Sequence, residues 1–196
     1  MSRFVRGAGA SVLACLLALA CAASGPAAAR ERAGRTDSMK DDRAFDEVRL
    51  GTREQSACSP EIDPFDSEFL GLLVAAPSKV ARRSASAPPA RLPVCITGQL
   101  SLREVRSHPD LAAAVELELT DVATGRVLRG SLADGRPSRP APQTDFDEAE
   151  QEARIDRFFF NVDASEVVAL PARAAEYELR VRLGERVSNT LRVSVE

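Results

Sequence analysis

The stretch "YELRVRLGERVSNTLRVSVE", residues 177–196, alternates apolar and polar side chains in two runs on either side of Gly184 and Glu185. Successive residues of a β-strand face opposite sides of a sheet, so each run predicts a strand with one buried and one solvated face. A glycine followed by a polar residue suits a tight type II′ hairpin turn. We therefore expect this stretch to form a β-hairpin.

The same alternation recurs upstream of this hairpin, beginning at Val94. The Ala-Thr-Gly that ends at Gly125 suits a type I turn closed by a left-handed glycine, which predicts a second hairpin. About seven strands are expected: 94–102, 115–122, the strand that returns after Gly125, 157–162, 166–170, 177–183 and 187–195. Short strands at this spacing predict an all-β fold of two stacked antiparallel sheets.

This pattern resembles the immunoglobulin-like modules of secreted bacterial proteins. The resemblance depends on "EYELRVRLGERVSNTLRVSVE" (176–196) and "ELTDVATGRVL" (118–128) and covers the last half of the chain. The chain departs from that family because it has no tryptophan and no cysteine after Cys95. The resemblance implies an immunoglobulin-like sandwich over residues 94–196, in a family whose members support, space or bind other proteins.

The N-terminus has the pattern of an export signal. Arg3 and Arg6 form a positively charged start, and residues 8–23 form an apolar stretch of the length that a signal peptide needs. A membrane-spanning helix requires about 20 apolar residues, and charged sequence follows this stretch directly. Residues 1–29 are therefore interpreted as an export signal, which predicts a periplasmic or extracellular location.

The sequence leaves two cleavage sites open. Cleavage after the small residues 27–29 would release a free protein that begins at Arg30. The segment "ALAC" (18–21) instead resembles a bacterial lipobox, with Ala18 where that pattern usually has leucine. Cleavage before Cys21 would leave a lipid on this cysteine, which is the only membrane attachment that we expect.

Cys58 and Cys95 remain in either product of cleavage. An isolated pair of cysteines in an oxidising compartment predicts a disulfide bond.

Four further segments organise the chain before and within the sandwich. Residues 30–57 are charged and lack periodicity, which predicts a flexible tether. Residues 58–93 form an extension with one apolar run, either strand or helix, followed by a loop rich in serine and proline. An insertion at 133–156 begins with prolines and ends in a short acidic helix, with Asp145 and Glu148 as its expected capping box. The acidic residues that we consider for partner binding in this insertion are Asp145, Asp147, Glu148 and Glu150.

The composition argues against most kinds of chemistry. A net charge of −3 and a single tyrosine provide neither the basic surface nor the stacking rings of nucleic-acid binding. His108 is the only histidine, and no short pair of metal ligands accompanies it, so we expect no metal or other cofactor. The acidic stretches could offer oxygen ligands to calcium, although neither matches an EF-hand loop.

These observations favour a non-catalytic exported module that binds or spaces other proteins of the bacterial envelope or extracellular space. The alternatives are a small secreted hydrolase with His108 as its base and a secreted module that inhibits proteases.

Overall fold

The computed structural model describes residues 42–63, 68–81, 91–133, 145–171 and 173–196. The chain divides into two compact units, Met1–Gly34 and Arg35–Glu196, and every described residue belongs to the second unit. The expected export signal and Cys21 lie outside the described residues. Among the residues described, no helix has the length and apolar character needed to cross a membrane.

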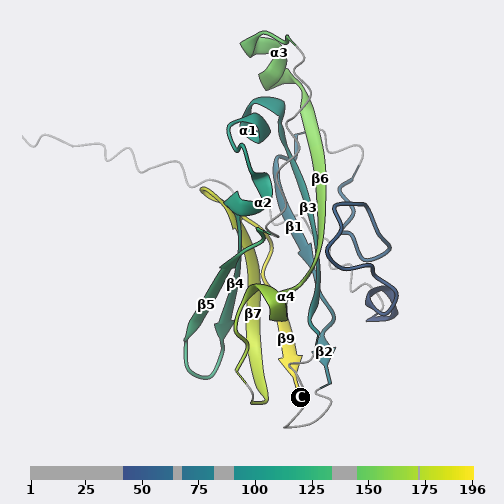
Figure 1. Ribbon diagram of the computed structural model, residues 1–196, viewed down its shortest axis with the longest axis vertical. Helices are drawn as coiled ribbons and strands as arrows, with labels where there is room; N and C mark the ends of the chain where they lie inside the picture. The colour runs from purple at the N-terminus through teal and green to yellow at the C-terminus, as the bar shows by residue number, and fades with distance from the viewer. Residues whose placement is uncertain (1–41, 64–67, 82–90, 134–144, 172) are drawn as a thin grey trace, which may run out of the picture. The chain divides into compact units, whose positions relative to one another are not determined.

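The described chain is mostly β-strand, arranged in two sheets that are shown in Figure 1. In sheet A, β3 lies between β1 and β6, and both pairings are antiparallel. In sheet B the order is β2-β9-β7-β4-β5, with β8 also paired to β7 and only the β2–β9 pair parallel. The strands are β1 (Gly71–Ala75), β2 (Lys79–Val80), β3 (Pro93–Ser101), β4 (Val115–Asp121), β5 (Val127–Ser131), β6 (Ile155–Asp163), β7 (Ala175–Leu183), β8 (Arg186–Val187) and β9 (Leu191–Val195).

The helices are short and lie at the ends of strands. Ser101 and Asp110 cap the N-termini of the first two α-helices with side-chain oxygens, as Ser and Asp do at many helix starts. The helical elements are the 3₁₀ helix η1 (Asp42–Phe45) and the α-helices α1 (Leu102–Arg106), α2 (Leu111–Ala114), α3 (Glu148–Ala153) and α4 (Ala164–Val167).

The core lies between the two sheets and follows from the alternation in the sequence. In β7, the odd-numbered side chains from Tyr177 to Leu183 are buried, whereas the even-numbered ones face outward. They pack in one cluster with inward side chains of sheet A such as Ile96 and Phe160. Burial of apolar surface of this kind stabilises a fold by about 25 cal/mol per Å², so the alternating positions determine which face of each strand is internal.

β3 differs from the other strands because both of its faces are buried. Residues 42–62 lie against the outer face of sheet A around Cys95, Thr97 and Asn161. Thr97 donates a hydrogen bond through Oγ1 to the carbonyl of Pro60 (2.9 Å), and Cys95 is bonded to Cys58. The predicted disulfide is thus present, with both cysteines fully buried.

The segment before Cys58 packs against the domain. Phe45, in η1, is 6% exposed and lies in a small apolar cluster with the two bonded cysteines. Asn161, in β6, accepts a hydrogen bond from Ser56 Oγ (3.0 Å) and donates to Thr52 Oγ1 and the Glu54 carbonyl (both 2.9 Å). The part of the expected tether from residue 42 to 57 is therefore a layer of the folded domain.

Most expected strands are present, but residues 166–170 do not form one. Asp163 accepts a hydrogen bond from the backbone of Ser165, and this cap begins α4 where the sequence suggested a strand. The apolar run of the extension forms strand β1. It pairs with β3, and its side chains alternate between half-buried and buried. Periodicity alone could not decide between strand and helix over so few residues.

The return strand of the final hairpin contains a bulge. Arg182 faces Val187, but Leu179 faces Leu191, so three residues oppose two between these positions. The side chain of Asn189, within the bulge, reaches across to sheet A. Its Oδ1 accepts from the Val74 N–H (2.8 Å) and its Nδ2 donates to the Val74 carbonyl (3.0 Å).

We expect loss of the disulfide to destabilise the domain strongly. The bond closes a loop over a separation of 37 residues, which in the chain-entropy model corresponds to about 3–4 kcal/mol. Urea unfolding of the oxidised protein and of the Cys58→Ala/Cys95→Ala variant would measure the difference. Equal midpoints for the two proteins would contradict the prediction.

Candidate protein-interaction face

The outer surface of sheet B carries a row of charged side chains, which we call the charged face. The pairing register places Glu118 of β4 opposite Arg129 of β5 on one side and Arg180 of β7 on the other. Glu178 of β7 lies opposite Arg192 of β9. Because outward positions recur at every second residue, the alternating sequence of each strand brings these charges together across four strands.

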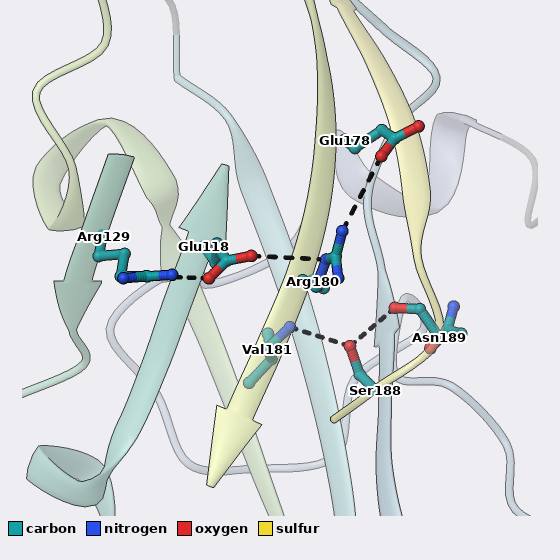
Figure 2. Close-up of polar contacts among 7 residues, drawn as sticks. All are labelled: Glu118, Arg129, Glu178, Arg180, Val181, Ser188 and Asn189. Carbon is teal, nitrogen blue, oxygen red and sulfur yellow. Dashed lines mark hydrogen bonds and ion pairs between the residues drawn. The ribbon is translucent and has the colours of Figure 1, made fainter. Parts of the chain in front are cut away.

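The charges of this face alternate in sign along the row (Figure 2). Glu118 accepts a hydrogen bond from Arg129 Nε at 2.9 Å and lies 3.6 Å from Arg180 Nε. Arg180 in turn lies 3.9 Å from Glu178, which is 3.5 Å from Arg192. Arg192 also contacts Glu176 at 3.5 Å, so the row ends with a carboxylate at β7 and with the Arg129 guanidinium at β5.

Glu118 is the most buried member of the row, with a side chain only 7% exposed. The side chains of Arg129 and Arg180 flank it, and their exposures are 60% and 33%. The buried carboxylate therefore lies between both guanidinium groups, and the Arg129 side chain is the more exposed of the two. Exposed ion pairs each contribute about 0–1 kcal/mol to stability, so the row is a weak source of folding free energy.

The charged face has apolar side chains at its two ends. Val127 of β5 lies opposite Thr120 and is 42% exposed, and Val187 of β8 lies opposite Arg182 and is also 42% exposed. On sheet A, residues 42–62 cover the outer face around Cys95 and Thr97, while Ile155 and Arg157 stay exposed on the same face. The face of sheet B is thus a broad surface of arginines, carboxylates and valines.

Asp121 holds the turn that presents β5 beside this face. Its carboxylate accepts a hydrogen bond from the Thr124 N–H (2.9 Å) and pairs with the guanidinium of Arg173, while Gly125 adopts the expected left-handed conformation. Burial opposes ionisation of Asp121, but the hydrogen bonds from Thr124 and the charge of Arg173 outweigh it and lower the pKa of Asp121 below its ordinary value.

Three acidic residues of the insertion, Asp147, Glu148 and Glu150, make contacts within the chain. The capping box forms between Asp147 and Glu150, two residues later than expected, because the helix begins at Glu148. Phe146 precedes the cap, with the Arg154 guanidinium 3.7 Å from its ring centroid, so Asp145 lies outside the helix.

Glu148 binds Arg103 of α1 at 2.8 Å and thereby attaches α3 to the rest of the domain. Residues 134–144 of the insertion lie outside the described part.

His108 is half-buried and lies in the turn between α1 and α2. Its backbone N–H donates a hydrogen bond to the Val105 carbonyl (3.2 Å). Asp110 caps the following helix by accepting a hydrogen bond from Ala113 N–H (3.1 Å). Two surface cavities of about 290 and 370 Å³ lie along residues 42–57, and His108 lines neither. In the described ranges, no three histidine, cysteine or carboxylate side chains gather as metal ligands would.

Comparison with protein-family models, curated proteins and solved structures finds no match for this chain.

We expect Glu118→Gln to destabilise the protein by about 1–2 kcal/mol, because it removes the buried charge that both arginines face. Glu178→Gln is the matched control: this residue lies on the same face, and its longer contacts make an effect below about 0.5 kcal/mol the expectation. Urea unfolding measures both variants. Equal losses would show that burial of Glu118 has no special role.

We expect Asp121→Asn to reduce stability at neutral pH but not in acid. The folded pKa of Asp121 lies below its unfolded value, so its contribution is present above that unfolded value, near pH 4, and disappears as the pH falls through the folded pKa. Melting temperatures of the two proteins should therefore converge as the pH decreases. A difference that persists in acid would contradict this account of Asp121.

Proposed function

We propose that this chain is a non-catalytic exported module that binds another protein of the bacterial envelope or extracellular space through the charged face. The observation that carries the proposal is the contrast between the two sheets. Residues 42–62 cover the outer face of sheet A around Cys95 and Thr97, whereas the outer face of sheet B presents an ordered row of arginines and carboxylates. Arginine is enriched in protein interfaces, and complementary charges favour specific, reversible association.

The proposal includes an immunoglobulin-like arrangement of the sandwich. Two features of the strand order support it. The chain passes from β1 at the edge of sheet A to β2 at the edge of sheet B, where β2 runs parallel to β9. The order β9-β7-β4-β5 then matches that of strands G, F, C and C′ in variable-type domains.

Export is supported by the leader pattern of residues 1–29 and by the buried disulfide between Cys58 and Cys95. Disulfides persist in oxidising compartments and are rare in the cytosol. Intact mass of the protein recovered from a bacterial host tests this part: a chain that begins at Arg30, or a lipid-modified chain that begins at Cys21, supports export. An unprocessed chain retained in the cytosol would refute it.

Photo-crosslinking in the native host tests binding. A photoreactive amino acid placed at Glu178 lies on the charged face, and the same group placed at Glu47 lies on the layer that covers sheet A. We expect a discrete adduct with one protein from position 178, none from position 47, and loss of the adduct when Arg192→Glu is added. Equal adducts from both positions, or none, would refute the proposed binding face.

A further inference from the structure

The sheets of this domain have four edge strands, and the outer edges of three of them are partly occupied or very short. In β1, the outward-facing backbone N–H and C=O of Val74 are hydrogen-bonded to the side-chain amide of Asn189. The outer N–H and C=O of Asn161 in β6 are bonded to the Thr52 carbonyl and the Gly51 N–H, at 2.9 and 2.7 Å. β2 is only two residues long.

The remaining part of the β6 edge is also partly occupied. The outward N–H of Arg157 donates to the carboxylate of Asp156 at 2.9 Å. Between Arg157 and Asn161, whose outward backbone groups are hydrogen-bonded, only Phe159 directs its backbone groups outward. Occupied, charged or very short edges are the usual ways in which proteins prevent a further strand from pairing.

The outer edge of β5 is different. Leu132 donates its N–H to Val115 of β4, and Arg126 accepts from the Asp121 N–H, so the even-numbered backbone groups face β4. In an antiparallel pair the intervening residues direct their backbone groups away, which applies to Val127, Arg129 and Ser131. Among the described residues, no hydrogen bond reaches these outward groups.

Charge determines which strand would fit this edge. The row of the charged face runs from Arg192 through Glu178, Arg180 and Glu118 and ends at Arg129, which lies on β5 itself. Its Nε binds Glu118, while the side chain is 60% exposed. A strand paired with the outer edge of β5 would place a side chain next to Arg129. Because the charges of the row alternate in sign, a carboxylate is favourable at that position.

A second copy of this chain would not satisfy that condition. Residues 122–132 contain Arg126 and Arg129 and no acidic residue. Antiparallel pairing of two β5 strands about Arg129 would place two guanidinium groups opposite each other, which is destabilising. A separate acidic strand avoids this repulsion.

We propose that the outer edge of β5 binds an extended segment of a partner protein, which adds a strand to sheet B and places a carboxylate against Arg129. The proposal deepens the proposed function by identifying where and how the partner of the charged face is held. Backbone hydrogen bonds to Val127 and Arg129 supply the pairing, and the arginine selects for acidic side chains.

Fluorescence anisotropy of short labelled peptides tests this proposal on the full oxidised chain. The probe alternates threonine and valine with glutamate on one face, and its counterpart has lysine in place of glutamate. We expect the glutamate peptide to bind at least about tenfold more tightly than the lysine peptide. We also expect Arg129→Gln to remove this preference. Arg49→Gln is the matched control: Arg49 is an exposed arginine of the layer of residues 42–62, outside the charged face, and its replacement should leave the preference unchanged.

Two measurements test the backbone contribution. Val127→Pro removes an outward N–H that no described residue uses, so we expect it to abolish binding while the melting temperature stays close to that of the parent. In the parent protein, hydrogen exchange at the amides of Val127, Arg129 and Ser131 should slow when the glutamate peptide binds.

The proposal is overturned if neither peptide binds, if both bind equally, or if binding occurs without slower exchange at these amides. The crosslinking experiment separates the two proposals. An adduct from position 178 without peptide binding would leave the protein-binding function intact and refute strand addition at β5.

Discussion

The layer formed by residues 42–62 covers part of the outer face of sheet A, and the disulfide between Cys58 and Cys95 bonds this layer to the central strand of that sheet. The core between the sheets buries the inner face of β3. The layer buries its outer side chains Cys95 and Thr97, and Thr97 makes its hydrogen bond to the layer itself. A buried polar group without a partner would cost about 1–3 kcal/mol, so the layer and the sheet beneath it depend on each other.

The consequence for binding is an asymmetric sandwich. One sheet has part of its outer face covered by the layer, and the pairing register of the other brings charged side chains into a row. Within that row the buried carboxylate of Glu118 lies between Arg129 and Arg180, and Arg129 is largely exposed. Ion pairs at a surface contribute little to stability, whereas an ordered arrangement of guanidinium groups is well suited to selecting a partner. The two proposals use the same surface in different ways: the charged face supplies specificity, and β5 supplies backbone pairing.

Two of the edge strands carry local features that limit pairing with a further strand. Asn189 places a side-chain amide where another strand would pair with β1, and the bulge that turns it there depends on one extra residue in the return strand. Asp156 binds the outward N–H of its own neighbour. Each of these local features uses a single short polar side chain. They limit the pairing of an exposed edge strand with another chain. The outer edge of β5 has no such feature among the described residues.

The sequence by itself determined the period of the strands, the hairpin at Gly125 and the disulfide. Each follows from residues close together in the chain or, for the cysteines, from counting, so local chemistry was sufficient. Only the tertiary structure decided that residues 42–57 belong to the folded domain and that α3 starts at Glu148 rather than earlier. It likewise decided that helix α4 (Ala164–Val167) ends where a strand over 166–170 was expected to begin. It also decided that the acidic insertion contacts α1 and that the row around Glu118 is the exposed polar surface. These outcomes depend on which distant segments cover a face or occupy an edge, and alternation along one strand carries no information about its neighbours.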